Sequence, residues 1–490
     1  MKGIIHIKNG NRYTENGWIR VNVHGTSEEI GYAHGVLLAD ELKKVVRNLD
    51  FVCMNSYGYS SNDLANIFYD IFEPRVKIGY PDLIEEMEGI AKGSKKGGFD
   101  IGIKKLFLWN CWYSIGYVMG SLYDIIHDNS ELKEKYGKLF PNKSAGGAAE
   151  GGGAKDRCTG FIAVGDWTED GKIVCGHNTF DNFIDAQFCN IMMCIKPKIG
   201  NSFIMQCAPG QVCSGTDYYV ASNGFIVTET TIGGFSAYAL GDPIFARIRK
   251  AVQRSNTVDE FIETLKTNNG GDYANSWLIG DTKNNEIIRV ELGLRFVNVE
   301  RKKNGYFIGF NAPYDDRLRC LECSNTGFYD IRRHQGARRV RLEQLMKQHK
   351  GKITVPIGQE ILADHYDVYL NKINMCSRTC CSHYELDQRE FMSQADRPLP
   401  YQPRGALDGI VSSTELAKSM GLSARWGSSC GYPFIASEFC KRNIQWADQA
   451  PYLDDRPSQP WTIFTCKKKS SANKTRQRKK GKKGTRRRKT

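Results

Sequence analysis

Hydrophobic residues recur at helical spacing in the first 140 positions of the chain and in short, strand-like runs after position 158. A capping-box signature, Thr26-Ser27-Glu28-Glu29, precedes a first helix, whose apolar positions include Ile30, Ala33, Val36, Leu37 and Leu42. Pro81 and the apolar face that follows it predict a second helix over residues 81–92, and residues 106–126 predict a third. We therefore expect residues 1–140 to be largely helical and to pack on the rest of the chain through these faces.

Strand runs joined by turn residues dominate the part of the chain after position 158. Three pairs of runs each flank a turn-forming segment: 161–164 and 172–175 around Asp170-Gly171, 218–221 and 225–228 around Asn223-Gly224, and 277–280 and 286–291 around residues 283–285. Residues 243–253 and 257–267 between them have helical spacing. Hairpins with inserted helices predict an antiparallel sheet and an α+β fold rather than a parallel βαβ fold.

A glycine- and alanine-rich stretch separates the two regions and runs into Asp156, Arg157 and Cys158. Such a segment stays accessible to solvent because it buries too little apolar surface to offset the entropy of ordering. If the bond between Arg157 and Cys158 is cut, Cys158 gains an α-amine with a pKa of about 7.7–8.0, which can act as the base for its own thiol. Judged by spacing alone, Cys158 could equally be a structural cysteine buried in the core. The chain has 16 cysteines, and a free cysteine usually behaves as a small buried apolar side chain.

These patterns divide the chain into four parts. We expect a helical amino-terminal part at 1–140, a cleavable linker at 141–157, a catalytic domain at 158–466 and a basic tail at 467–490. The tail holds fourteen Lys and Arg and no acidic residue, so it accounts for the whole net charge of +14. It is predicted to be disordered, and it is compatible with binding to nucleic acid or an anionic membrane, with nuclear import, or with a solubilising role.

The chain does not begin with the apolar core of a secretory signal peptide, so we expect an intracellular protein, cytoplasmic or virion-associated if its source is viral. Its cysteines are then expected to be thiols rather than a disulfide framework. Polar residues make 106–126 a poor membrane span. Cys320 and Cys323, with Cys376, Cys380 and Cys381, have some features of zinc spacing, but the second half does not fit a standard knuckle. We expect no metal and no cofactor.

The residues after Cys158 resemble the phospholipase B-like (lamina ancestor) proteins, a family within the N-terminal-nucleophile hydrolases, which include penicillin acyltransferases and bile-salt hydrolases. The resemblance extends over about 210 residues, and its strength lies in the order of the motifs. They are Cys158-Thr159, His177-Asn178-Thr179, Ala208-Pro209-Gly210, Asp217-Tyr218-Tyr219, Glu229-Thr230-Thr231-Ile232-Gly233, Tyr273-Ala274-Asn275-Ser276-Trp277, Phe310-Asn311-Ala312-Pro313, Arg332-Arg333 and Asp364-His365-Tyr366-Asp367. Phe180 departs from the family, which usually has tryptophan there.

The resemblance implies a four-layer αββα sandwich, self-cleavage before the cysteine and two fragments that stay together. It also implies hydrolysis of acyl bonds, as in the removal of fatty acyl chains from phospholipids. The site residues that it implies are Cys158 as nucleophile, His177, Thr231 or Thr230, and Asn275 as an oxyanion donor. A protonated His177 is one way to favour the Cys158 thiolate. The family's arginine is left open among Arg317, Arg332 and Arg333.

Three functions remain open from the sequence. The first is a self-processing phospholipase B-like hydrolase, whose partners are an acylated lipid or small molecule and its own amino-terminal fragment. The second is an amidase or acyltransferase that acts on N-acyl substrates with the same scaffold. The third is a binding protein with an idle hydrolase fold, anchored to nucleic acid or an acidic surface by its tail. The animal relatives are secreted to the lysosome, a location that the start of this chain does not support.

Overall fold

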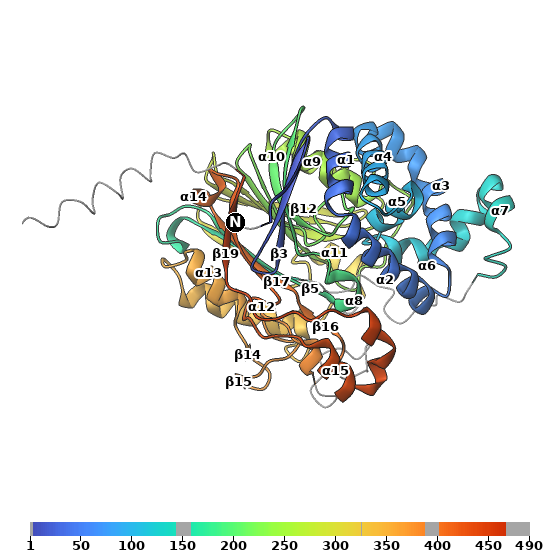
Figure 1. The fold of residues 1–490 in the computed structure, drawn as a ribbon. Helices are drawn as coiled ribbons and strands as arrows, with labels where there is room; N and C mark the ends of the chain where they lie inside the picture. Colours follow the sequence, from blue (N-terminus) through green and yellow to red (C-terminus); the bar gives the residue numbers. More distant parts are fainter. Residues whose placement is uncertain (1–2, 144–157, 325, 388–400, 467–490) are drawn as a thin grey trace, which may run out of the picture.

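The computed structural model describes residues 3–143, 158–324, 326–387 and 401–466. The expectations for the glycine-rich linker, apart from residues 141–143, and for the basic tail lie outside the described residues. The fold is of the mixed α+β kind, with two large sheets at its centre and helices around them (Figure 1).

The larger sheet has ten strands, of which three come from before the glycine-rich segment and seven from after it. Its strand order is β1-β2-β3-β6-β7-β8-β9-β10-β11-β12, and among these strands β3 and β6 pair in parallel while the others pair antiparallel. The bounds are β1 Ile5–Ile7, β2 Gly10–Glu15, β3 Trp18–Gly25, β6 Ile191–Pro197, β7 Phe203–Cys207, β8 Tyr219–Ala221, β9 Phe225–Thr231, β10 Asn275–Asp281, β11 Glu286–Leu292 and β12 Val297–Lys302.

The second sheet has seven strands, and the first of them along the chain, β4, starts at the candidate nucleophile Cys158. Its order is β13-β4-β5-β17-β18-β19, and β16 pairs with β5 beside this path. The bounds are β4 Cys158–Val164, β5 Val174–Asn182, β13 Gly305–Gly309, β16 Arg404–Ala406, β17 Asp408–Ser413, β18 Gly421–Trp426 and β19 Thr462–Thr465, and a small separate sheet joins β14 Tyr366–Asp367 to β15 Lys372–Ile373. The three predicted hairpins are present as β4–β5, β8–β9 and β10–β11.

The two sheets pack face to face, and helices cover their outer sides. A Cβ added to Gly160 of β4 would lie 3.4 Å from Thr230 of β9 and 3.5 Å from Leu278 of β10, which are ordinary van der Waals distances and show that the two sheets are in close contact here. Phe161 and Ala163 of β4 point the other way, into an apolar cluster with residues of α12 and α13. Figure 1 shows α12 and α13 on one side of the sheets and α9 and α10 on the other.

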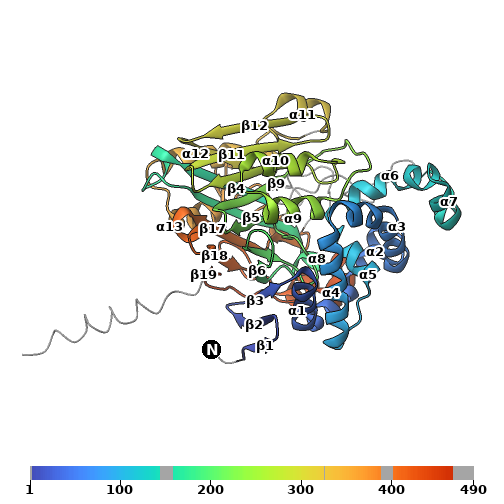
Figure 2. The same cartoon turned by 90° about the horizontal axis from the view of Figure 1, so that it is seen from above.

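The helices differ in part from the sequence expectation. Figure 2 shows the amino-terminal helices gathered at one end of the sheets. Residues 106–126 form two helices rather than one, separated by a turn at residues 111–114, where the Trp112 and Ser114 side chains donate to Asp185 and Asp272. The helix bounds are α1 Ser27–Leu37, α2 Ala39–Tyr57, α3 Ser61–Gly79, α4 Pro81–Lys96, α5 Ile103–Asn110, α6 Ile115–His127, α7 Ser130–Tyr136, α8 Phe183–Ala186, α9 Ile244–Arg254, α10 Val258–Lys266, α11 Asp316–Leu321, α12 His334–Gln348, α13 Val355–Leu362, α14 Thr414–Ala417 and α15 Ala436–Arg442, with short 3-10 helices at Gly165–Trp167, Tyr384–Leu386 and Ile444–Tyr452.

Strands β1–β3 lie within residues 5–25, so the expectation of a largely helical amino-terminal part is wrong for this segment. Strand β3 pairs with β6 over seven residue positions, from Ile19 opposite Ile191 to Gly25 opposite Pro197. A buried ion pair of 2.6 Å between Glu86 of α4 and Arg249 of α9 adds a second link. A chain cut before Cys158 therefore keeps its amino-terminal piece as part of the larger sheet.

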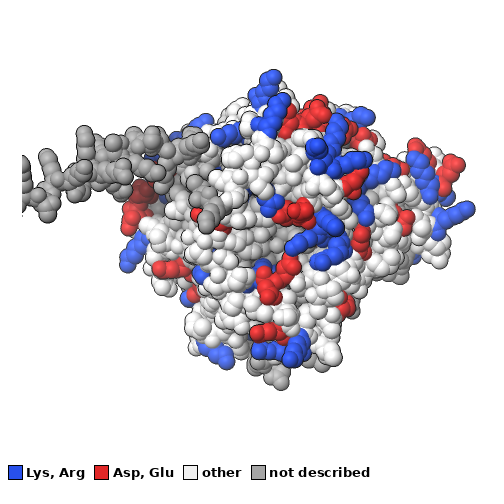
Figure 3. Space-filling view, viewed as in Figure 1, with Lys and Arg blue, Asp and Glu red and all other residues white. Residues whose placement is uncertain are grey.

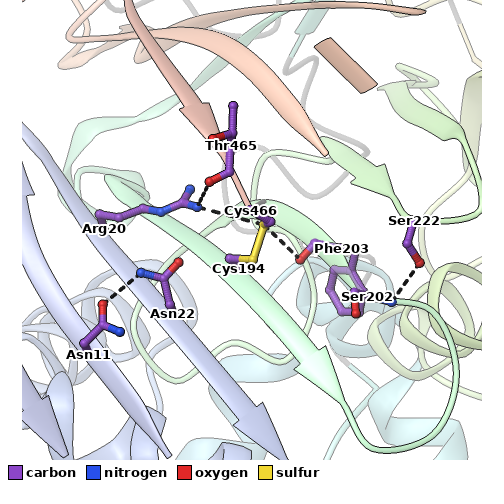
Figure 4. The surroundings of a disulfide bond; sticks show 9 residues. All are labelled: Asn11, Arg20, Asn22, Cys194, Ser202, Phe203, Ser222, Thr465 and Cys466. Carbon is purple, nitrogen blue, oxygen red and sulfur yellow. Dashed lines mark hydrogen bonds between the residues drawn. A yellow bond between two sulfur atoms is a disulfide. The ribbon is translucent and has the colours of Figure 1, made fainter. Parts of the chain in front are cut away.

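A disulfide joins an interior strand of the larger sheet to the end of the edge strand of the second sheet (Figure 4). It pairs Cys194 of β6 with Cys466, directly after β19, and Arg20 of β3 donates to the carbonyl oxygen of Thr465 beside it at 2.8 Å. The expectation that the cysteines are thiols is therefore wrong for this pair. Because the bond closes a loop of 272 residues, its reduction removes a restraint on the unfolded chain.

On the face of the molecule drawn in Figure 3, basic and acidic side chains are interspersed, and neither sign of charge forms a continuous patch. This mixture agrees with the balanced charge of residues 1–466. Among the described residues, no helix combines the length and the apolar character that crossing a membrane requires.

Acid is expected to destabilise the protein through His34 of α1. This side chain is fully buried, and its Nε2 accepts the backbone N–H of Gly210 at 2.8 Å, so its imidazole is neutral. Burial lowers the pKa of His34 to about 3, whereas its pKa in the unfolded chain is about 6.5. Unfolding then takes up a proton below pH 6.5, and stability falls from that pH toward pH 3, by about 2 kcal/mol at pH 5.

We expect His34→Gln, which keeps an acceptor for Gly210, to reduce by about 2 kcal/mol the loss in free energy of unfolding between pH 7.5 and pH 5. Chemical denaturation at the two pH values measures this difference. His6→Gln is the matched control, because His6 is exposed on β1. An unchanged pH dependence in His34→Gln would contradict the assignment.

Candidate active site

Cys158 is the first residue of β4 and the first described residue after the glycine-rich segment. It is buried, with 1% of its surface exposed, between the neighbouring strands β13 and β5. Its backbone N–H, the group that becomes the α-amine after a cut, donates to Oδ1 of Asn311 at 3.3 Å. Both reactive groups expected of this residue therefore lie inside the protein at the start of a central strand.

Asn311 connects Cys158 to the other sheet. It follows β13 with a backbone φ of +68°, a left-handed conformation that asparagine tolerates better than most residues. Its Nδ2 donates to the carbonyl oxygen of Thr231 at 2.7 Å, while its Oδ1 accepts from Cys158. The side chain is thus fixed at both ends, and it positions the Cys158 nitrogen relative to the end of β9.

The arginine at the site is Arg338 of α12, which the sequence did not single out. Its buried guanidinium donates to the carbonyl oxygen of Cys158, to Oγ1 of Thr159 at 3.1 Å and to Oδ1 of Asn311 at 2.8 Å. It also lies 5.3 Å from the centre of the Phe180 ring. A fixed positive charge thus stands beside the peptide unit of the nucleophile, where it favours negative charge on sulfur or on an attacked carbonyl.

The three arginines left open by the sequence lie elsewhere. Arg317 and Arg332 are exposed and pair with Asp315 and Asp330 at 2.7 and 2.8 Å. Arg333 precedes α12 as its N-cap residue. None of these three has a contact with Cys158 among the interactions of the described residues, whereas Arg338, which lies outside the set that the sequence left open, does.

Thr231 and Asn275, both site residues that the resemblance implies, lie opposite each other on β9 and β10. Oγ1 of Thr231 and the hydroxyl of Tyr273 are 3.1 Å apart, and the Tyr273 hydroxyl donates to Glu229 at 3.2 Å and to Asp217 at 3.1 Å. With its amide oriented to satisfy its neighbours, Asn275 donates to Oε2 of Glu229 at 2.8 Å. The two residues thus belong to one buried polar network around Glu229.

Thr230, the alternative to Thr231, faces the opposite way. Its methyl and hydroxyl lie over Gly309 of β13 and Gly160 of β4, and its Oγ1 is buried with no hydrogen bond in the described residues. Alternation along β9 therefore places the Thr230 side chain between the sheets and that of Thr231 in the polar network.

We expect Thr231→Val to cost about 1–3 kcal/mol, because the hydroxyls and carboxylate around it lose a hydrogen-bond partner, and to slow any processing at Cys158. Thr230→Val, the matched control of equal shape, is expected to change stability by less than about 0.5 kcal/mol, since its hydroxyl has no partner to lose. Denaturant unfolding of both variants measures the difference. Equal effects of the two substitutions would contradict the assignment of these side chains.

His177 of β5 lies on the same face as Cys158, opposite Gly160 and two positions from Thr179, the partner of Cys158. Such diagonal neighbours are about 7–8 Å apart. The ring is fully buried, and burial lowers the pKa of His177 to about 3, an effect that a backbone hydrogen bond with Glu229 offsets only in part. The idea that a protonated His177 favours the thiolate is therefore wrong: the imidazole is neutral at physiological pH.

The cysteines with zinc-like spacing do not assemble as one group. Cys320 is exposed at the end of α11, Cys323 belongs to a small apolar cluster with Leu318, and Cys380 packs in the core beneath α12 and α13. Cys376 hydrogen bonds to Asp367 at 3.4 Å. Cys381 lies instead beside two histidines and another cysteine, at a place that the sequence did not indicate.

Comparison with known proteins finds distant relatives. No family model matches the sequence. An uncharacterized protein of Archaeoglobus fulgidus is 23% identical over 282 residues, 55% of this chain and 42% of that protein. A phospholipase B of Crotalus adamanteus is 27% identical over 238 residues, 43% and 40% of the two chains, and a protein of Rattus norvegicus named phospholipase B-like 2 is 23% identical over 271 residues, 46% and 44%. The alignments thus span less than half the length of each of these relatives.

Among solved structures, a mutant of the conjugated bile acid hydrolase from Clostridium perfringens aligns with a TM-score of 0.31 and 12% identity, over 55% of this chain and 89% of that one. A TM-score of 0.31 is too low to support a conclusion about this chain. The relatives in sequence include the phospholipase B-like proteins that the motifs resemble, and the two named relatives bear a name that denotes hydrolysis of phospholipid acyl bonds.

Proposed function

We propose that this chain is a self-processing cysteine hydrolase of the N-terminal-nucleophile type, which removes acyl chains from phospholipids. The observation that carries the proposal is the setting of Cys158, which opens a central strand directly after a glycine-rich segment and has its nitrogen on Asn311 and its carbonyl on Arg338. In this assignment the stacked sheets with their outer helices are a four-layer αββα sandwich, and the amino-terminal part remains bound after the cut.

Self-cleavage begins with attack of the Cys158 sulfur on the carbonyl carbon of Arg157. A carbon–sulfur bond forms, the bond from that carbon to the Cys158 nitrogen breaks, and the nitrogen takes up the thiol proton to become an amine. Water then hydrolyses the thioester, which releases a carboxylate on Arg157 and restores the thiol. Asn311 fits this step because its Oδ1 holds the nitrogen that leaves.

Turnover uses the same sulfur with the new amine as its base. The amine takes the thiol proton, the sulfur attacks the acyl carbonyl of the substrate, and the resulting ammonium protonates the leaving alcohol. Water hydrolyses the thioester and releases the fatty acid. The Arg338 guanidinium favours the negative charge that develops close to Cys158. Asn275 is the oxyanion donor that the resemblance implies, and to serve in this way it must release one of the two hydrogen bonds that its amide donates to Glu229 and to the carbonyl of Ala274.

Paired substrates test the reaction. The purified full chain is incubated with lysophosphatidylcholine and with an analogue in which an amide replaces the ester, and released fatty acid is quantified by mass spectrometry. We expect release from the ester at a rate that exceeds release from the amide, and none from Cys158→Ala. Release from the amide alone would replace the proposal with an amidase, and no release from either substrate would overturn it.

A further inference from the structure

A compact group of four metal-binding side chains lies outside the candidate active site. It consists of His365, Cys381, His383 and Cys430, whose ligand atoms all lie within 4.8 Å of one another. They come from three separate places: the segment after α13, the turn before the 3-10 helix at Tyr384–Leu386, and the loop after β18. Cys381 and His383 are buried, whereas His365 and Cys430 are half-buried.

The polar atoms in this cluster point at a shared centre. Nε2 of His383 lies 3.3 Å from the sulfur of Cys381 and 3.4 Å from that of Cys430, so two sulfurs compete for a single ring nitrogen. Nε2 of His365 is shielded from solvent and makes no hydrogen bond in the described residues. A cation at the centre satisfies all four atoms, which hydrogen bonds among them do not.

The surroundings fit a bound metal ion. Oε1 of Glu385 lies 2.7 Å from Nδ1 of His383, an arrangement that keeps the proton on Nδ1 and leaves Nε2 as a ligand. The backbone N–H of Tyr432 donates to the sulfur of Cys430 at 3.3 Å, a contact that suits a thiolate. A surface pocket of about 710 Å³ is lined by His365 and Cys430, which gives an ion a path from solvent.

We propose that His365, Cys381, His383 and Cys430 bind one structural zinc ion. Two thiolates and two imidazoles are a common tetrahedral zinc set, with ligand atoms about 3.3–3.8 Å apart at ordinary bond lengths, so the cluster needs only a small contraction. Because protein side chains fill all four positions, no open position remains for water or substrate, and the ion holds three loops together rather than taking part in hydrolysis.

The proposed zinc site supports the wall of the candidate active site. Phe180, Cys381 and Ala406 form a small apolar cluster, with Cys430 packed against it, and the Arg338 guanidinium lies over the Phe180 ring at 5.3 Å from its centre. The cluster therefore links the loops of the zinc site to the arginine beside Cys158. Loss of the ion is expected to loosen Phe180 and with it the position of Arg338.

The first experiment measures zinc in the purified full chain, expressed with added zinc chloride, by inductively coupled plasma mass spectrometry. We expect one zinc ion per chain, released by a thiol-modifying reagent, and in the cobalt-substituted protein the thiolate-to-cobalt charge transfer and strong visible bands of a tetrahedral site. These readouts need no variant. Absence of zinc from protein with reduced thiols, or a disulfide between Cys381 and Cys430 in peptide mapping, would overturn the proposal.

Variants then test the ligands. We expect Cys430→Ser and His365→Ala to lose the zinc, His365→Cys to retain it because a thiolate replaces the imidazole, and Glu385→Gln to lower zinc affinity about 10–100-fold. Cys440→Ser in α15 is the matched control outside the cluster and is expected to keep one ion per chain. Equal zinc content in Cys430→Ser and Cys440→Ser would overturn the assignment of Cys430, whatever the hydrolytic activity of either protein.

Discussion

Cys158→Ala is expected to leave the chain uncut between residues 157 and 158 and to lower acyl hydrolysis by at least about 10³-fold. The substitution removes the sulfur that attacks both the Arg157 carbonyl and the substrate. No other residue is expected to take over this role, so both reactions lose their nucleophile. A denaturing gel measures the cut, and fatty acid release measures the hydrolysis.

The matched control is Cys175→Ala on β5, which removes a buried thiol opposite Ile162 in the same strand pair. This variant is expected to be cut and active, with only a loss of stability from the small cavity. If Cys158→Ala were processed and hydrolysed substrate at the rate of the unchanged protein, another residue would have to be the nucleophile.

Arg338→Met is expected to have the next largest effect, a loss of about 10²–10³-fold in the rate of self-cleavage and of hydrolysis. Methionine fills much of the same volume but leaves the Cys158 carbonyl, Thr159 and Asn311 without their donor, and it removes the positive charge beside the reacting peptide. Arg338→Lys keeps the charge but not the planar set of donors, so we expect an intermediate loss. Single-turnover kinetics of cleavage and of fatty acid release measure both effects.

Arg332→Met and Arg317→Met are the controls for this prediction. Both side chains are exposed and pair with a nearby aspartate, so their removal is expected to change the rates by less than about twofold and stability by less than about 1 kcal/mol. A larger loss in Arg332→Met than in Arg338→Met would return the role to one of the arginines that the sequence suggested.

Local chemistry explains which elements could be predicted from the sequence. The capping box at Thr26, the helical spacing of residues 257–267 and the turn at Asn223-Gly224 act within a few residues, and the structure confirms the helices and the hairpin that they predict. Strands β2 and β3 carry a local signal that the prediction missed, because Asn16-Gly17 forms a two-residue hairpin turn between them. Only the pairing of β3 with β6 depends on a partner far along the chain.

The candidate site likewise combines features that local sequence predicts with features that only tertiary packing decides. The place of Cys158 follows from its glycine-rich neighbour. The pairing of β9 with β10, which sets Thr231 opposite Asn275, was not predicted and comes from the structure. Arg338 could not be chosen, because α12 also holds Arg339 and Arg341, and only packing decides which one turns inward. Arg338 is fully buried at Cys158, whereas Arg339 and Arg341 pair with Glu343 and Asp364.

The proposed zinc site was missed for a related reason. Zinc motifs are recognised when pairs of ligands are close in sequence, and that rule directs attention to Cys320 and Cys323. Here only Cys381 and His383 are close in sequence. His365 and Cys430 lie on separate loops, which the sheet and α13 bring together in space. The signal is a matter of tertiary structure, and a search by spacing does not detect it.

Amino-terminal sequencing of the purified full-length product, together with its intact mass, tests the central claim most directly. The account predicts two polypeptides that stay associated, and the one that carries residues 158–466 begins Cys-Thr-Gly-Phe. A single uncut chain that hydrolyses substrate at full rate would contradict it.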